Sequence, residues 1–102
     1  MAELVWTEPA LSDLDQIADH IALDNPEAAK RLVKRIFRHV EQLQDQPESG
    51  SVPKEFCPRK TYRQIVEKPC RVFFRIEGET IFIVHVMRGE RVLRSRNLRR
   101  ES

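Results

Sequence analysis

The chain has 102 residues, of which 40% are hydrophobic and 33% charged, and its formal net charge is +2 at pH 7. This length gives room for one hydrophobic core rather than two domains, and the composition is that of a globular protein, not of a disordered tail. No apolar run reaches the ~20 residues that a membrane-spanning helix needs, and the first residues lack the pattern of a signal peptide, so a cytoplasmic protein is expected.

The first predicted elements are a short strand and a helix. Residues 3–7 include Leu, Val and Trp and are typical of a strand. Thr7 is placed to cap a helix that begins with Glu8 and Pro9. The apolar stripe of this helix, at steps of three and four residues, comprises Leu11, Leu14, Ile17, Ala18, Ile21 and Ala22. The side chains expected to face outward are Asp13, Asp15, Gln16 and Asp19.

A second helix is predicted to begin at Pro26, with Asn25 as its N-cap, and to end at Pro47. Its apolar stripe comprises Ala29, Leu32, Val33, Ile36, Phe37, Val40 and Leu43. Because the linker between the helices is short, we expect an antiparallel helix hairpin. Two helices cannot cover each other's apolar faces fully, so a flat layer must lie beneath them.

The rest of the chain is predicted to form that layer. A loop over residues 47–58 leads to three strands, over 62–66, 70–76 and 80–87. A tight connection at residues 77–79 makes the last two strands a hairpin, and the last strand is apolar on both faces, as a central strand is. The predicted fold is therefore α+β, in the order β-α-α-β-β-β, with a helix hairpin packed on a mostly antiparallel sheet. We expect one domain over residues 1–102, with a basic tail from about residue 92.

Basic side chains are concentrated in the second half of the chain. Residues 1–53 carry a net charge of −5 and residues 54–102 a net charge of +7. Arg63, Arg71 and Arg75 are expected to project from the sheet face opposite Val72 and Phe74. Guanidinium groups bind carboxylates and phosphates in a bidentate manner, so we expect this face to be an anion-binding surface. The alternative is that these charges only keep a small protein in solution.

More arginines follow the predicted central strand: Arg88, Arg91, Arg94, Arg96, Arg99 and Arg100. They extend the predicted basic surface beyond the sheet. The segment from Arg94 to Arg100 has a second interpretation, as a solvated tail or one that faces a protein partner.

Candidates for acid–base chemistry are few. His85 is the only histidine within a predicted strand, and imidazole titrates near neutral pH. It has no carboxylate at an obvious partner position, and packing is the competing interpretation. A polar cluster at Lys54, Arg59, Lys60 and Tyr62 could orient a phosphate, or be an exposed loop beside a buried tyrosine.

No metal or cofactor site is predicted. Cys57 and Cys70 are not part of a CxxC pair, and the histidines lie far from them and from one another. Phosphate-binding glycine motifs are absent.

Taken together, the order and spacing of several motifs resemble the RelE/ParE toxin superfamily, on the ParE side, over nearly the full chain. These motifs are Glu8-Pro9-Ala10, Asp13-Leu14, Ile17, Asp24-Asn25-Pro26-Glu27-Ala28-Ala29, Ile36 to Leu43, Pro47, Gly50, Tyr62-Arg63, Arg71-Val72-Phe73-Phe74-Arg75-Ile76 and Val84-His85-Val86-Met87-Arg88-Gly89-Glu90-Arg91.

This resemblance implies a toxin of a type II toxin–antitoxin pair, held inactive in a hetero-oligomer by a ParD-like antitoxin. It implies that ParE-like members poison DNA gyrase, whereas RelE-like members cut messenger RNA on the ribosome. Arg71 and Arg91 fall on the arginines that stabilise the scissile phosphate in the nuclease branch. Val92-Leu93-Arg94 follow Arg91, so the tyrosine acid of that branch is missing. Arg88 and Glu90, on either side of Gly89, differ from many ParE sequences.

Three hypotheses follow. The first is a gyrase poison without cofactor, whose target-binding residues are Arg63, Arg71, Arg75, Arg88 and Arg91. The second is an endoribonuclease that uses Arg71, Arg91, Lys60 and His85. The third is an antitoxin-binding module without toxicity. Fold class alone does not separate them.

Overall fold

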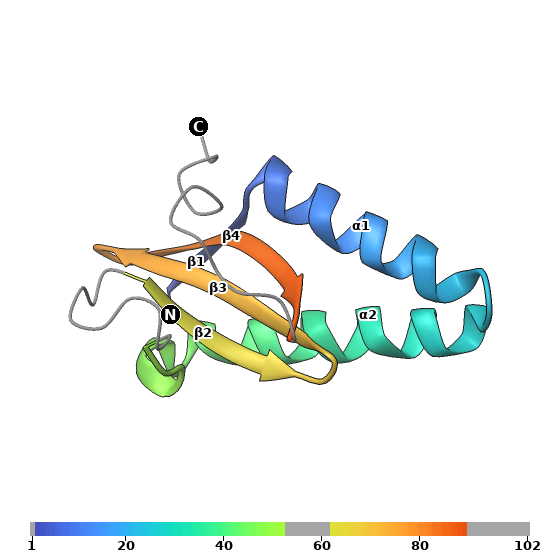
Figure 1. Ribbon diagram of the computed structural model, residues 1–102. Helices are drawn as coiled ribbons and strands as arrows, with labels where there is room; N and C mark the ends of the chain where they lie inside the picture. Colours follow the sequence, from blue (N-terminus) through green and yellow to red (C-terminus); the bar gives the residue numbers. More distant parts are fainter. Residues whose placement is uncertain (1, 53–61, 90–102) are drawn as a thin grey trace.

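The computed structural model describes residues 2–52 and 62–89 (Figure 1). Its elements are β1 (Glu3–Trp6), α1 (Glu8–Ala22), α2 (Pro26–Glu41), β2 (Tyr62–Glu67), β3 (Cys70–Glu77) and β4 (Thr80–Arg88). The predicted α+β class and the order β-α-α-β-β-β are confirmed. The predicted basic tail and residues 53–58 of the predicted loop lie outside the described residues. Neither helix in the described part of the chain is long and apolar enough to cross a membrane.

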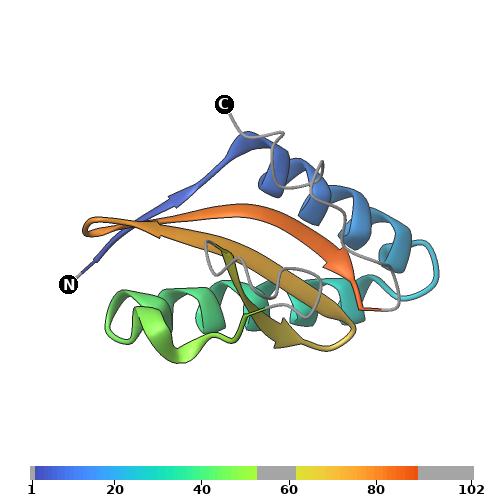
Figure 2. The ribbon, with the colours of Figure 1, turned by 60° about the vertical axis from the view of Figure 1, so that its left-hand side comes forward.

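The sheet has the strand order β1-β4-β3-β2, with β1 parallel to β4 and the other neighbours antiparallel (Figure 2). The prediction that the strand beginning at Thr80 is central is confirmed. Gly78 has a φ of +60° in the turn between β3 and β4. Glycine adopts this left-handed conformation without a steric penalty, so it suits the tight hairpin turn that was predicted here.

The helix starts follow the predicted caps. The Thr7 hydroxyl accepts a hydrogen bond from the Ala10 amide at 3.4 Å and donates to the Ile83 carbonyl at 2.8 Å. Asn25 Oδ1 accepts from the Ala28 amide at 3.0 Å. Each cap satisfies an N–H that the first turn of a helix leaves without an intrahelical acceptor. Thr7 in addition ties the start of α1 to β4, so the cap also fixes where the helix begins relative to the sheet.

Two details of the helices differ from expectation. Helix α2 ends at Glu41, before Pro47, and the chain continues in a 3-10 turn over Gln42–Gln44, from which Leu43 still enters the core. Leu11 was assigned to the buried stripe of α1 but is 40% exposed. It lies at the margin of the stripe, where one helical step turns a side chain out of contact with the sheet.

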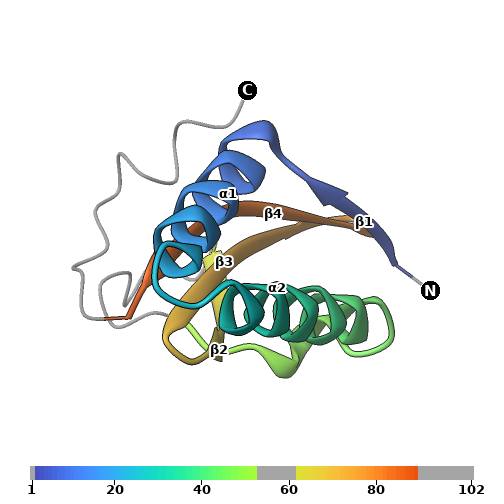
Figure 3. The ribbon, with the colours of Figure 1, turned by 90° about the vertical axis from the view of Figure 1, so that its right-hand side faces the viewer.

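The main core lies between the helices and one face of the sheet (Figure 3). Figure 3 shows α1 and α2 foreshortened, and the two helices pack side by side, as the predicted hairpin requires. Trp6 and Phe37 extend this core, and the centroids of their rings lie 4.9 Å apart. The fully buried members from helices and strands include Ile36, Val40, Val72, Phe74, Ile81 and Ile83. The sheet is therefore the flat layer that covers the apolar stripes of the two helices.

A close approach of backbones at Gly50 leads to a first prediction. A Cβ atom at Gly50 would lie 2.7 Å from the Gln64 carbonyl oxygen and 2.8 Å from the Phe74 ring. The oxygen belongs to the backbone and the Phe74 ring is fully buried. Because neither can move away easily, we expect Gly50→Ala to lower the free energy of unfolding by about 1–3 kcal/mol. Chemical denaturation measures this. Gly78→Asn is the control, because asparagine tolerates a positive φ. Equal stability of the two variants would contradict the prediction.

Candidate functional site: the distal face of the sheet

The sheet face turned away from the helices, here called the distal face, carries two of the predicted arginines. Along β3, Arg71, Phe73 and Arg75 alternate with Val72 and Phe74, which belong to the main core. Successive side chains of a strand point to opposite faces. The prediction that Arg71 and Arg75 lie opposite Val72 and Phe74 is therefore confirmed.

Both guanidinium groups stack on aromatic rings. The Cζ atom of Arg71 lies 4.9 Å from the centroid of the Phe73 ring, and its Nε donates to Gln64 Oε1 at 3.0 Å. The Cζ atom of Arg75 lies 4.4 Å from the centroid of the Phe82 ring, and its Nε pairs with a Glu77 carboxylate oxygen. Cation–π contact and a hydrogen bond at Nε together hold each planar group in one orientation.

Between the two arginines the distal face has a small apolar core of its own. Phe73, Val84 and Met87 are buried there, and Tyr62 and Phe82 pack against them. Tyr62 is the only residue of the predicted cluster at Lys54, Arg59, Lys60 and Tyr62 within the described ranges, and it belongs to this apolar core. The distal face is thus aromatic as well as basic.

Arg63 does not belong to the distal face, so its predicted position is wrong. In the ladder between β2 and β3, Arg63 is opposite Phe74, whereas Tyr62 is opposite Arg75. Residues that face each other across a ladder share a face. Arg63 consequently lies on the helix side of the sheet, where its Nη1 donates to the Gly50 carbonyl at 3.0 Å. Alternation along β2 does not reveal its register against β3, and a shift of one residue in that register moves every side chain of the strand to the opposite face.

Arg88 lies in the sheet and not after it. It is the last residue of β4 and is opposite Cys70, which is buried in the main core. Arg88 is therefore on the same face as Val72 and Phe74. Arg91 and Lys60, the other predicted functional cations, lie outside the described residues. The described part of the chain thus places Arg71 and Arg75 on the distal face and Arg63 and Arg88 on the other face.

A bulge in β4 sets the position of His85. The pairing of β3 with β4 shifts from Phe74 opposite Ile83 to Phe73 opposite His85, so Val84 is an extra residue. Without this bulge, strict alternation from Ile81 and Ile83 would turn His85 toward the helices. With it, His85 lies on the distal face, and its ring stacks on Phe73 with centroids 5.7 Å apart and an interplanar angle of 18°.

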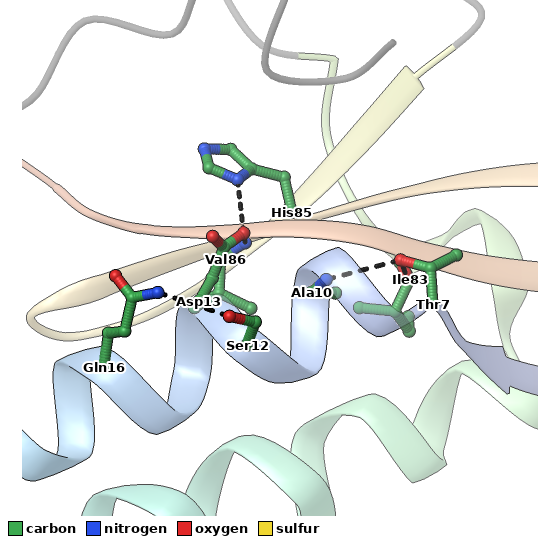
Figure 4. Close-up of polar contacts among 8 residues, drawn as sticks. All are labelled: Thr7, Ala10, Ser12, Asp13, Gln16, Ile83, His85 and Val86. Carbon is green, nitrogen blue, oxygen red and sulfur yellow. Dashed lines mark hydrogen bonds and ion pairs between the residues drawn. The ribbon is translucent and has the colours of Figure 1, made fainter. Parts of the chain in front are cut away.

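His85 has a carboxylate partner that the sequence did not indicate. Figure 4 shows the Asp13 side chain extending from α1 to His85 and Val86. Asp13 Oδ2 lies 2.6 Å from His85 Nδ1 and accepts from the Val86 amide at 3.2 Å. The side chains of His85 and Asp13 are 8% and 14% exposed. Both earlier expectations, that Asp13 faces outward and that His85 has no obvious carboxylate partner, are therefore wrong.

The geometry explains why Asp13 turns inward. Strand β1 pairs with β4 only from Glu3 to Trp6, ending opposite Ile83. The chain then enters α1, which packs along β4 beyond that point. Buried backbone amides need an acceptor, and the Asp13 carboxylate provides it for Val86. Because the same oxygen accepts from Val86, we assign the shared proton to His85 Nδ1, which donates to Asp13.

This arrangement suits a structural role for His85 better than catalysis. The imidazole is buried, stacked and hydrogen-bonded to a helix that anchors β4. A general base must reach the proton that it removes, either directly or through one water.

Within residues 2–52 and 62–89, no group of three or more His, Cys, Asp or Glu side chains could hold a metal ion.

Comparison with known proteins places these observations in one family. The family model described as the ParE toxin of the type II toxin–antitoxin system, parDE, matches residues 4–93. Toxin RelE2 of Caulobacter vibrioides is 33% identical over 90 residues, which are 86% of this chain and 92% of that protein. A chain described as the chromosomal ParDE TA system from P. aeruginosa is similar with a TM-score of 0.72 and 34% identity, covering 88% of this chain and 98% of its own length. The chain belongs to the ParE toxin family of type II toxin–antitoxin systems.

Proposed function

We propose that this toxin acts by binding DNA gyrase and blocking replication, and that a cognate antitoxin neutralises it. The family model that matches is that of ParE, and the resemblance to ParE-like toxins implies a gyrase target. One observation favours binding over catalysis: His85, the histidine considered as a general base, is buried and engaged by Asp13.

The same observation weighs against the ribonuclease hypothesis. That hypothesis assigned the chemistry to Arg71, Arg91, Lys60 and His85. Of these, Lys60 and Arg91 lie outside the described residues, and Arg71 can stabilise a charge but cannot act as a base at neutral pH. The sequence also lacks a tyrosine directly after Arg91. The distal face carries arginines, and its histidine is hydrogen-bonded to Asp13. Such a face is better suited to bind an anionic partner than to cleave RNA.

We propose that Arg71 and Arg75 contact the target from the distal face. Their guanidinium groups are already oriented by Phe73 and Phe82, so less side-chain entropy is lost when an anion binds. The proposed contact surface is narrower than the sequence predicted, because Arg63 and Arg88 lie on the helix side. A partner docked flat on the distal face would leave these two arginines out of the contact.

The antitoxin partner is supported by the similar chain from the ParDE system. We propose that acidic side chains of the antitoxin cover Arg71 and Arg75. Charge complementarity would speed the encounter and exclude a target that needs the same arginines. Binding of antitoxin and of gyrase would then be mutually exclusive.

Supercoiling by purified gyrase, with and without the purified protein, tests this function. We expect loss of supercoiling with accumulation of cleaved DNA, and full recovery when the antitoxin is added. A parallel reaction with translating ribosomes and messenger RNA should show no cleavage. Intact gyrase activity together with cut transcripts would establish the nuclease instead, and inactivity in both assays would leave an antitoxin-binding module.

A further inference from the structure

The helix hairpin has an apolar groove on its surface, close to the turn that joins α1 to α2. The groove has a volume of about 410 Å³, and its apolar lining includes Ala18 and Ala22 from α1 and Ala29 and Val33 from α2. Leu23, the residue after Ala22, is 81% exposed. Side chains as small as alanine let another helix approach closely. The fold therefore leaves an apolar concave surface in water, on the helices and away from the distal face.

The charged residues around this groove have opposite signs on its two sides. Asp19 lines it from α1, and Lys30 and Lys34 line it from α2. All three are exposed. Lys30 Nζ lies 3.8 Å from Glu27 Oε1, and both side chains are 71% exposed. Such a surface pair contributes little and is readily exchanged for another. The groove thus has a negative edge on one helix and a positive edge on the other.

We propose that this groove is the interface of a homodimer, in which two copies pack hairpin against hairpin. A two-fold axis parallel to the helices places α1 of each copy on α2 of the other. Asp19 of each copy then lies opposite Lys30 and Lys34 of the other. Because of the two-fold symmetry, this pairing of opposite charges occurs twice in the dimer. A two-fold axis across the helices would set like charges against each other. Charge complementarity therefore selects both the occupant of the groove and its orientation.

The size of the hairpin face indicates a weak dimer. Helices of 15 and 16 residues are roughly 22–24 Å long, and two of them side by side are about 20 Å wide. The projected contact is on the order of 450 Å², below the ~800 Å² of accessible surface that each partner buries in a stable complex. We expect a dissociation constant on the order of 10 μM. The distal face stays uncovered in both copies, so each dimer would present two Arg71–Arg75 surfaces.

Sedimentation equilibrium of the purified chain tests this dimer. Over a roughly 100-fold range of concentration around the expected dissociation constant, the average mass should rise from the monomer value of 12.0 kDa toward twice that value. Asp19→Lys alone, and Lys30→Glu with Lys34→Glu, should each remain monomeric, because like charges then meet across the interface. Glu48→Lys is the matched control: it reverses an exposed charge outside the groove and should dimerise as the unchanged chain does.

The decisive sample is an equimolar mixture of the two charge-reversed variants. Each copy then meets the opposite charge on its partner, so a heterodimer should form although neither variant self-associates. This result also shows that both variants are folded. A monomer at every concentration of the unchanged chain, or a mixture that stays monomeric, would overturn the proposal. Loss of antitoxin binding in the groove variants, with the unchanged chain monomeric throughout, would assign the groove to the antitoxin instead.

Discussion

Replacing Asp13 with alanine is expected to lower the free energy of unfolding by about 2–4 kcal/mol. The Asp13 carboxylate accepts from both His85 Nδ1 and the Val86 amide, at the edge of β4 where pairing with β1 has ended. Its removal takes the acceptor from two buried donors at once. For a domain of this size, we expect the melting temperature to fall by roughly 10–25 °C. Thermal and chemical denaturation, followed by circular dichroism, measure the change.

Two variants on α1 make the test specific. Asp15→Ala removes an exposed carboxylate two residues away and should change stability by no more than about 0.5 kcal/mol. Asp13→Asn keeps an oxygen that can accept from Val86 but removes the charge that favours the contact with His85, so its loss should be intermediate. If Asp13→Ala were as stable as Asp15→Ala, the contact of Asp13 with β4 would not stabilise the fold.

A double-mutant cycle then separates the two donors. His85→Ala removes the imidazole and leaves the Val86 amide bonded to Asp13. The coupling free energy between the Asp13→Ala and His85→Ala changes isolates the contribution of the contact between these two side chains. A coupling near zero would mean that Asp13 stabilises the fold only through the backbone of β4.

Replacing Arg71 with alanine is expected to weaken inhibition of gyrase by roughly 10- to 100-fold while the protein stays folded. The estimate follows from losing a charged hydrogen-bonding group, about 1.5–3 kcal/mol. The contacts with Phe73 and Gln64 are worth about 1–2 kcal/mol together, which is less than the total stability of a typical domain. The concentration of protein that halves supercoiling is the quantity to measure, alongside the melting temperature.

Two arginine variants serve as controls for Arg71. Arg38→Ala removes an exposed arginine on α2, away from the distal face, and should inhibit gyrase as the unchanged protein does. Arg71→Lys keeps the charge but loses the planar group that stacks on Phe73, so inhibition should be intermediate. Undiminished inhibition by folded Arg71→Ala would remove Arg71 from the contact surface, and with it the proposed role of the distal face.

Much of the fold could be predicted because the signals are local. The Thr7 and Asn25 caps, the helix stripes and the turn at Gly78 depend on residues a few positions apart. The alternation of Arg71, Phe73 and Arg75 with Val72 and Phe74 is equally local, and the structure confirms it.

The wrong predictions about the candidate site concern relations between distant segments. The side of the sheet on which Arg63 lies depends on the register of β2 against β3, and that register is set where the strands pair. The bulge at Val84 has the same character, because it exists only relative to β3. No pattern within a single strand distinguishes these alternatives.

By itself, the sequence determined the class of the fold, the order of its elements, the two distal arginines and the family to which the chain belongs. Periodicity and capping carry that information because they act over one or two turns of chain. Only the tertiary structure decided that Asp13 and His85, 72 positions apart, form a buried pair. Their contact depends on β1 ending at Trp6, on α1 packing along the edge of β4 that β1 leaves unpaired, and on a bulge that turns the imidazole to the distal face.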